Sequence, residues 1–188
     1  MIIGIHGPIN SGKNTIADYI MSKDEKYRCY AFAKPIKDAC KVLFGFSDEQ
    51  IEDRILKESI DEFWGFSPRR TMQLLGTEFG RNMLRDDIWI QRAEMEVNKN
   101  KKDGYSTIIT DLRFENESEW IRSKENYKII YIEVQNLIRD EKYQHTSEAG
   151  IKRYDTDIMI YNDKSTGLSN LHKQIDVIYE KYISNISR

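Results

Sequence analysis

The sequence predicts an α/β fold in which a parallel sheet of about five strands carries helices on both faces. Five short runs rich in isoleucine, tyrosine, valine or threonine have the composition of strands, and helical patterns lie between them. This alternation favours parallel strands, because each crossover must traverse the sheet and a helix does so compactly. A chain of 188 residues suffices for a single domain, 1–188, with one substantial core. The predicted strands are residues 2–5, 27–33, 106–111, 127–134 and 157–161.

A glycine-containing loop follows the first predicted strand. Residues 7–15 read GPINSGKNT, which fits the pattern G-x-x-x-x-G-K, and a helical run over residues 16–21 comes next. Such a loop curls so that several N–H groups point inward, Lys13 adds a cation, and the helix presents its positive end to an anion. A plain glycine turn beside a surface lysine is the alternative, which the flanking strand and helix disfavour. The segment predicts a loop that binds the phosphates of a nucleoside triphosphate.

The loop departs from the common pattern at one position. Asn14 follows the lysine, where a serine or threonine hydroxyl ordinarily binds Mg²⁺, and the hydroxyl comes one residue later at Thr15. We therefore expect Mg²⁺ to be held more through water, by Asn14 or by a carboxylate elsewhere. The candidate metal ligands are Asn14, Thr15 and Asp111.

The composition limits the classes of partner. Charged residues make up 32% of the chain and nearly balance at a net charge of −2, which argues against an electrostatic nucleic-acid binder. Cys29 and Cys40 have no metal-ligand spacing, so reduced thiols in the cytosol are expected. No apolar run approaches the length of a membrane span, and we see no cleavable leader. These features predict a soluble protein of the cytoplasm, or of the host cytoplasm if the chain is viral.

The region between the second and third predicted strands is long. It spans about seventy residues, far more than one crossover helix needs, and we expect several short helices there. Ser47 with Gln50 has the pattern of a capping box, and Ser67 followed by Pro68 that of an N-cap with proline at the first helical position. We expect this insertion, about residues 45–105, to carry the site of a second substrate.

The last predicted helix has the clearest period. Its apolar residues recur every three or four positions and would form one stripe that packs against the sheet. The residues of this stripe are Leu168, Leu171, Ile175, Ile178, Tyr182 and Ile186.

Candidate binding residues follow the predicted strands. In an open parallel sheet, ligands bind beyond the carboxyl ends of the strands, which singles out residues 34–38 after the second strand and residues 111–113 after the third. Asp111 is either an acid that binds Mg²⁺ or substrate, or a plain helix N-terminal acid. Transfer of a phosphoryl group between two anionic molecules requires several cations. The candidates are Lys13, Lys37, Arg69, Arg70, Arg113 and Arg139.

Two further features of the long region have alternative interpretations. Arg69 and Arg70 stand at a predicted helix start and could clamp a monophosphate, because the guanidinium fork matches two phosphate oxygens at once. They could also be a solvated surface pair. Trp89 could stack on a base or belong to the core beside Ile90.

Taken together and in this order, six segments resemble the bacteriophage-type deoxynucleoside monophosphate kinases, which are P-loop nucleotide kinases. The stretch R-R-x-M-Q-x-L-G-T over residues 69–77 is the most specific, and the other segments are individually weak. The six are residues 7–15, 33–39 (AKPIKDA), 69–78 (RRTMQLLGTE), 111–113 with Glu117, 145–150 (HTSEAG) and 160–163 (IYND).

The resemblance implies a three-layer P-loop kinase fold and an enzyme that moves the γ-phosphate of ATP to a deoxynucleoside monophosphate, with Mg²⁺. It implies ATP-phosphate contacts by Asn10, Gly12, Lys13, Asn14 and Thr15. It assigns the monophosphate pocket to Lys37, Arg69, Arg70, Gln73, Gly76, Thr77, Trp89, Asp111, Arg113 and Glu117. The catalytic set would be Lys13, Arg70, Asp111, Arg113 and Arg139, the last in a lid at about residues 136–155. Small nucleotides are the expected partners, without nucleic acid or membrane, and a homodimer is the default assembly.

Two other functions use a similar loop. One is another small-molecule kinase on this scaffold, such as a dephospho-coenzyme A kinase or a phosphomevalonate kinase. The other is a nucleotide-dependent switch, which is disfavoured because the guanine-reading element N-K-x-D is absent: residues 98–101 read NKNK.

Overall fold

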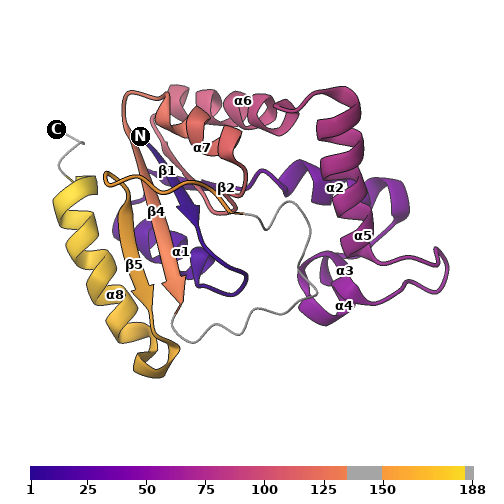
Figure 1. Ribbon diagram of the computed structural model, residues 1–188, viewed down its shortest axis with the longest axis horizontal. Coiled ribbons are helices and arrows are strands. Elements are labelled where there is room, and N and C mark those ends of the chain that lie inside the picture. The colour runs from indigo at the N-terminus through magenta and orange to yellow at the C-terminus, as the bar shows by residue number, and fades with distance from the viewer. Residues whose placement is uncertain (135–149, 185–188) are drawn as a thin grey trace. The chain divides into compact units, whose positions relative to one another are not determined.

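The computed structural model describes residues 1–134 and 150–184, and within them five parallel strands form one sheet (Figure 1). The strand order is β2-β3-β1-β4-β5, so β1 occupies the centre. This confirms the predicted α/β fold with an all-parallel sheet. The strands are β1 (Ile2–His6), β2 (Tyr27–Tyr30), β3 (Ser106–Ile109), β4 (Tyr127–Val134) and β5 (Ile158–Asn162).

Two strands are shorter than predicted. β2 and β3 pair from Tyr27 with Ser106 to Tyr30 with Ile109, and the last backbone bond runs from Thr110 N–H to the Tyr30 carbonyl. Beyond it the chain turns towards α2, because Ala33, the N-cap of that helix, already has right-handed helical dihedral angles. The predicted strands 27–33 and 106–111 were therefore too long, and Asp111 lies in the loop after β3.

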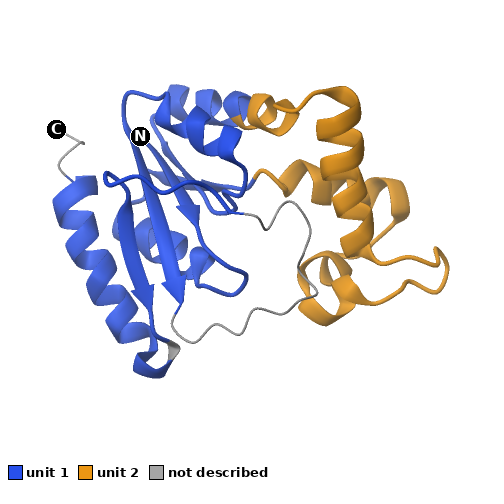
Figure 2. Ribbon diagram, in the orientation of Figure 1, with its two compact units in different colours: residues 1–31, 94–188 blue, residues 32–93 orange. Residues whose placement is uncertain are grey.

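The helices fall into two compact units (Figure 2). We call residues 1–31 and 94–188 the sheet unit and residues 32–93 the helical unit. The α-helices are α1 (Lys13–Lys23), α2 (Lys34–Phe44), α3 (Asp48–Glu52), α4 (Arg54–Glu58), α5 (Pro68–Gln73), α6 (Ile88–Lys102), α7 (Glu115–Arg122) and α8 (Gly167–Ile178). A π-helical segment, Leu74–Leu84, continues α5, another, Tyr179–Ile183, continues α8, and a 3₁₀ turn, Lys164–Thr166, precedes α8.

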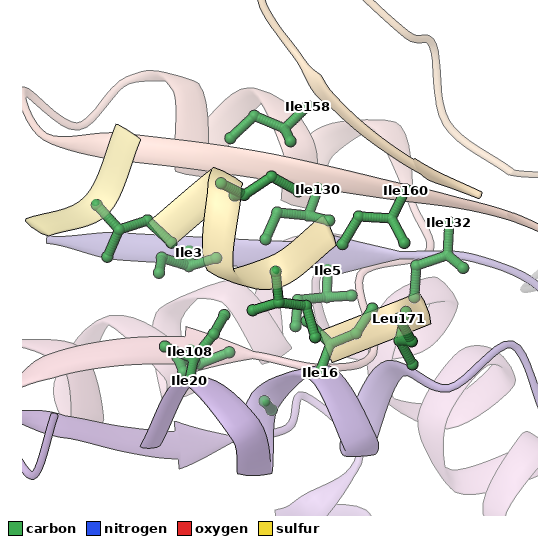
Figure 3. Close-up of a cluster of buried hydrophobic side chains, with 14 of the residues drawn as sticks. Ile3, Ile5, Ile16, Ile20, Ile108, Ile130, Ile132, Ile158, Ile160 and Leu171 are labelled. Carbon is green, nitrogen blue, oxygen red and sulfur yellow. The ribbon is translucent and has the colours of Figure 1, made fainter. Parts of the chain in front are cut away.

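Isoleucines dominate the core of the sheet unit (Figure 3). Ile3 and Ile5 of β1 are fully buried against α1 and α8, which cover one face of the sheet. On the other face, a Cβ added at Gly4 would lie 2.7 Å from a methyl carbon of Ile121, so α7 packs closely over the centre of β1. Each fully buried isoleucine contributes about 1.5–3 kcal/mol relative to exposure. This core fixes β1, and with it the loop that follows.

The last helix confirms the predicted packing on the sheet but corrects the stripe at its ends. Leu171, Ile175 and Ile178 are buried, whereas Leu168 is 59% exposed. After Ile178 the helix widens to π-type turns, which insert extra residues per turn and shift the buried position to Ile183. Tyr182, predicted for the stripe, only packs against the cluster from the side, and Ile186 lies outside the described residues.

The helical unit has a small core of its own. Ile36, Cys40, Phe46 and Ile51 are buried together, and aromatic side chains pack around them. Both predicted caps are confirmed. The Ser47 hydroxyl and the Gln50 side chain exchange hydrogen bonds with each other's backbone N–H, and the Ser67 hydroxyl accepts from Arg70 N–H before Pro68. Short helices therefore begin where the sequence predicts. None of the helices in the described part of the chain has the length and apolarity required to cross a bilayer.

Candidate active site

The predicted phosphate loop joins the carboxyl end of the central strand β1 to the start of α1. Gly12 has φ 94°, a left-handed conformation that favours glycine, and Asn10 is left-handed as well with φ 61°. The left-handed dihedral angles of these two residues make the loop turn sharply before α1. The Lys13 ammonium donates to the carbonyls of Gly7 at 2.7 Å and Pro8 at 2.6 Å, so the cation lies against the loop.

A residue far along the chain holds the loop, and close packing inside the loop restricts Gly7. Asn162, at the end of β5, donates from its side-chain amide to the Ser11 carbonyl at 2.8 Å. Ser11 is fully buried, and a Cβ at Gly7 would lie 2.7 Å from its hydroxyl oxygen, so only glycine fits there. Sequence reasoning missed both roles. The signal for Asn162 was its place in the segment 160–163, directly after a strand.

The first turn of α1 carries the two residues predicted to contact Mg²⁺. Asn14 is exposed and Thr15 is half-buried. In the described part of the chain, no three His, Cys, Asp or Glu side chains gather closely enough to hold a metal ion by themselves. A metal at this loop would need phosphate oxygens and water to complete its shell.

The segment after β3 adjoins the end of β1. The two strands pair in parallel from Ile2 with Thr107, and His6 Nδ1 lies 2.9 Å from the Leu112 carbonyl. A carbonyl only accepts, so His6 Nδ1 carries the hydrogen and ties the two strand ends together. Half-buried Asp111 and Arg113 flank this contact.

Glu117 has a structural role. Its buried carboxylate accepts the backbone N–H groups of Arg113 at 2.9 Å and Phe114 at 3.1 Å, at the start of α7. An acid at the third position of a helix commonly satisfies such backbone donors. Glu117 therefore fixes the turn that presents Arg113, and its predicted contact with the monophosphate stays a prediction.

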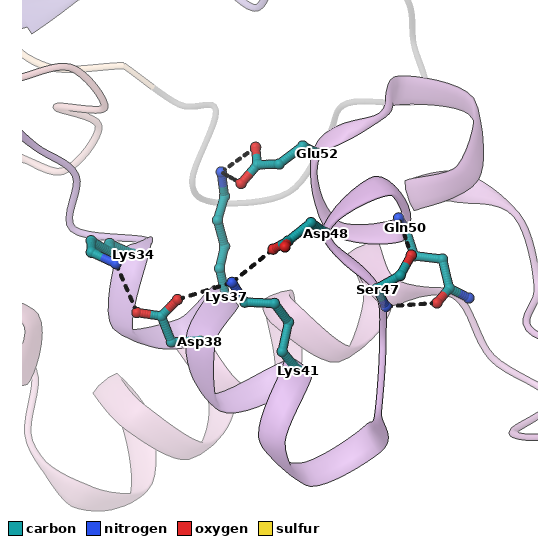
Figure 4. Close-up of polar contacts among 8 residues, drawn as sticks. All are labelled: Lys34, Lys37, Asp38, Lys41, Ser47, Asp48, Gln50 and Glu52. Carbon is teal, nitrogen blue, oxygen red and sulfur yellow. Dashed lines mark hydrogen bonds and ion pairs between the residues drawn. The ribbon is translucent and has the colours of Figure 1, made fainter.

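In the helical unit, two of the predicted cations already have carboxylate partners. Lys37 Nζ lies 2.8 Å from Glu52 Oε1 and 2.7 Å from Glu52 Oε2 (Figure 4), and Arg69 Nε donates to Glu58 Oε1 at 2.8 Å. Neither carboxylate was predicted. Glu52 and Glu58 neutralise two cations that could otherwise bind a phosphate.

Arg70 differs from its neighbour Arg69. It lines a pocket of about 460 Å³ together with Ile60, Gly65, Phe66 and Ser67. Within the described residues its guanidinium makes no ion pair. A cation beside an apolar wall in an open pocket suits a ligand that combines a phosphate with a flat ring.

The remaining predicted residues follow Arg70 along the helical unit. The buried Gly76 offers its carbonyl to Trp89 Nε1 at 2.7 Å, which uses the only donor of the indole. Trp89 is half-buried against the core of the unit, as the core interpretation expects, and its contact with a base stays a prediction. Gln73 and Thr77, which lie close to Gly76 in sequence, are half-buried.

Arg139 and most of the predicted lid, 136–155, lie outside the described residues. The end of that segment is anchored to the sheet unit: Lys152 N–H donates to Glu115 Oε2 at 2.8 Å, and its carbonyl accepts from the Tyr131 hydroxyl at 2.5 Å. Burial, with the nearby Asp157 carboxylate, raises the pKa of Tyr131 to about 12, so its hydroxyl remains a donor at neutral pH.

Among solved structures, the chain is similar to dephospho-CoA kinase from Campylobacter jejuni. The TM-score is 0.52 at 12% sequence identity, and the match covers 98% of each chain. At this identity the likeness supports the P-loop kinase fold alone.

Two curated proteins are similar over most of the chain. The deoxynucleoside-5'-monophosphate kinase of Escherichia phage T5 is 26% identical over 239 residues, covering 93% of this chain and 94% of that protein. The putative deoxynucleotide monophosphate kinase of Acanthamoeba polyphaga mimivirus is 33% identical over 186 residues, covering 88% and 90%. The family model for deoxynucleotide monophosphate kinase matches residues 43–175. The chain therefore belongs to the deoxynucleotide monophosphate kinase family and is a kinase that uses ATP.

Proposed function

We propose that this kinase transfers the γ-phosphate of ATP to a deoxynucleoside monophosphate, with ATP at the loop after β1 and Arg70 among the cations that bind the acceptor phosphate. Family membership supports the reaction. The observation that carries the ATP assignment is the loop at the end of β1, where Lys13 lies against the carbonyls of Gly7 and Pro8.

On the ATP side, Lys13 would exchange the carbonyls of Gly7 and Pro8 for phosphate oxygens. The inward N–H groups of the loop and the N-terminus of α1 favour the same anion. Around the phosphates we place Asn10, Gly12, Lys13, Asn14 and Thr15.

On the acceptor side, arginine is the best phosphate clamp, because its fork donates two parallel hydrogen bonds. Arg70 in its pocket is the strongest candidate. We assign the monophosphate pocket to Lys37, Arg69, Arg70, Gln73, Gly76, Thr77, Trp89, Asp111, Arg113 and Glu117.

The chemistry needs positioned charge more than a base. The acceptor phosphate is already ionised, so no proton has to be abstracted before it attacks the γ-phosphorus. Lys13, Arg70 and Arg113 would neutralise the charge that spreads over the transferred group, and Arg139 completes this set in our assignment.

Magnesium fits the oxygen donors available here. Asp111 offers a carboxylate and Thr15 a hydroxyl, and Asn14 could act through water. Mg²⁺ commonly binds through one or two carboxylates, several waters and substrate phosphates. When bound, it supplies charge neutralisation at the β- and γ-phosphates.

The setting of the enzyme follows from its substrates. ATP and nucleoside monophosphates are cytoplasmic metabolites, so we place the enzyme in the cytoplasm, or in the host cytoplasm if the chain is viral. We further propose one kinase domain over residues 1–188 that includes the insertion at about 45–105 and a lid at about 136–155. A homodimer is its proposed assembly.

An ATP-coupled assay against the four deoxynucleoside monophosphates and their ribose counterparts tests this function. We expect formation of a nucleoside diphosphate from at least one deoxynucleotide. Dephospho-coenzyme A and phosphomevalonate belong in the same panel, because a P-loop kinase could instead act on these acceptors. Phosphorylation of either one without any nucleotide would overturn the proposal, as would ATP hydrolysis without transfer.

A further inference from the structure

The pocket that Arg70 lines is walled mainly by one loop of the helical unit. Residues 59–67 form this loop, which joins α4 to α5, and Arg70 follows on α5. We call the cavity, about 460 Å³ in volume, the Arg70 pocket. The described residues that line it are Ile60, Gly65, Phe66, Ser67 and Arg70. All of them belong to the helical unit, so these walls come from one compact unit.

The loop is closed by hydrogen bonds between its own ends. Asp61 N–H donates to the Phe66 carbonyl at 3.1 Å, and Gly65 N–H donates to the Asp61 carbonyl at 2.8 Å. The side-chain amide of Gln50 donates to the Asp61 carboxylate at 2.9 Å, which ties the loop to α3. The two ends of the loop are therefore held together, and Ile60 and Phe66 line the same pocket.

The ring of Phe66 is held by two aromatic neighbours. Its centroid lies 5.7 Å from that of Phe44, edge to face at 90°, and 6.0 Å from that of Trp64, with 25° between the planes. Trp64 is fixed in turn, because its indole N–H donates to the Phe44 carbonyl at 2.8 Å. Phe66 is half-buried in this arrangement and still lines the pocket. The ring is therefore preorganised, and a flat ligand could stack on it with little loss of side-chain entropy.

The Arg70 pocket has unfilled space beside apolar side chains. Ile60 is 70% exposed, and a Cβ built at Gly65 would meet no atom within 4 Å. Packing against the core explains the burial of Phe66, but not why an exposed isoleucine and an arginine line the same space. Pockets that combine apolar walls with one placed charge are typical of sites for small organic ligands. Arg70, which forms no ion pair within the described part of the chain, selects a ligand with a negative charge.

We propose that Phe66 stacks on the base of the acceptor nucleotide and that Ile60 adds an apolar contact to it, while Arg70 binds the phosphate of the same molecule. A nucleoside monophosphate combines a flat ring with an anionic group, and these three side chains fit that combination. Neither Phe66 nor Ile60 was predicted from the sequence. The inference rests on the proposed function, since that function makes the ligand a deoxynucleoside monophosphate.

The first test removes the aromatic ring. We expect Phe66→Leu to weaken equilibrium binding of the monophosphates by about tenfold, measured by calorimetry without ATP, because the stack between base and ring is lost. Binding of 2-deoxyribose 5-phosphate, which has no base, should change little, whereas Arg70→Ala should weaken both ligands. Phe66→Tyr keeps the ring and should restore most of the affinity. Phe63→Leu is the matched control: it makes the same change in the same loop, but Phe63 is 84% exposed and does not line the pocket.

The second test changes a side chain that the fold does not need. Because Ile60 is 70% exposed, Ile60→Ser should leave the Tm at the wild-type value. We expect it to weaken monophosphate binding by about threefold, since apolar contact with the base is lost, and to leave 2-deoxyribose 5-phosphate unaffected. Ile55→Ser is the control, because Ile55 is 76% exposed on α4 and does not line the pocket.

The probes are dAMP, dGMP, dCMP and dTMP in turn, each compared with 2-deoxyribose 5-phosphate. If wild-type protein phosphorylates a monophosphate but Phe66→Leu and Ile60→Ser bind it as tightly as wild type does, this inference fails and the proposed function stands. Equal weakening of nucleotide and sugar phosphate by Phe66→Leu, with a lower Tm, also overturns the inference, because Phe66 then only supports the pocket. If wild-type protein phosphorylates no member of the panel, the proposed function fails. The preference of wild type for nucleotide over sugar phosphate, and its loss in Phe66→Leu, then decide by themselves whether the ring binds a base.

Discussion

Lys13 in the sheet unit and the cations Lys37 and Arg69 in the helical unit, all predicted to bind phosphate, are held in different ways. In the sheet unit, Lys13 is bound by the backbone carbonyls of Gly7 and Pro8. In the helical unit, Lys37 and Arg69 are bound by side-chain carboxylates on short helices. Carbonyl groups of the loop backbone are fixed by the fold, whereas exposed carboxylates can rotate into solvent.

This difference affects how each group of cations can bind an anion. The loop is shaped before any ligand binds, since the central strand precedes it and Asn162 supports it through Ser11. Preformed sites cost little to reorganise, so the ATP site depends on backbone geometry. In the proposed acceptor site, Lys37 and Arg69 would have to exchange their carboxylate partners for an incoming phosphate. The predictions below separate these two dependences.

The largest expected effect is on the sheet unit. Lys13→Ala should lower phosphoryl transfer by about 10²–10³-fold, because one charged donor to the transferred group is lost. The measurement is kcat/KM in the coupled assay, with circular dichroism to show that the fold persists. Turnover close to wild type would remove Lys13 from the catalytic set.

A smaller effect is expected on the helical unit. Arg70→Ala should raise KM for the monophosphate by about tenfold or more, since a charge-assisted contact of about 1.5–3 kcal/mol is lost. KM for ATP should change little. Arg85→Ala is a control, because that exposed arginine pairs with Asp87 in the same unit. A rise in KM for ATP alone would place Arg70 with the wrong nucleotide.

Support of the loop should matter less than the loop itself. Asn162→Ala removes a neutral hydrogen bond worth about 1 kcal/mol, so we expect KM for ATP to rise about fivefold. Gln174→Ala provides the comparison, because the Gln174 side chain forms hydrogen bonds with the backbone of Tyr161 in β5 but not with the loop. Equal effects of both variants would mean that the contact with Ser11 has no special role.

The smallest effect concerns a cap in the helical unit. Ser47→Ala should lower the free energy of unfolding by about 1 kcal/mol through loss of the capping box at α3. Urea denaturation measures this change. KM for ATP should stay at the wild-type value, and a change in it would show that α3 affects the loop.

Local sequence signals predicted much of this molecule. The phosphate loop, the strands and both caps depend on residues within a few positions of one another, as with Ser47 and Gln50. Long-range pairings could not be predicted in this way. Asn162 is 151 residues from Ser11. No local sequence pattern indicates that Glu52 pairs with Lys37 or that Glu58 pairs with Arg69.

The ends of elements were also misplaced for physical reasons. Phe32 and Thr110 have the β-propensity of strand residues, but the pairing of β2 with β3 ends at Tyr30 and Ile109. The apolar period of the last helix assumed 3.6 residues per turn, and the π-type turns after Ile178 break that assumption. Such offsets depend on tertiary packing.

The most direct test of the central claim is equilibrium binding of ATP and of a monophosphate, each alone, to Lys13→Ala and Arg70→Ala. The account predicts that the effects separate: Lys13→Ala loses affinity for ATP and keeps the monophosphate, and Arg70→Ala does the reverse. Loss of both ligands by both variants, in proteins with wild-type Tm, would contradict the assignment of Lys13 to ATP and of Arg70 to the monophosphate.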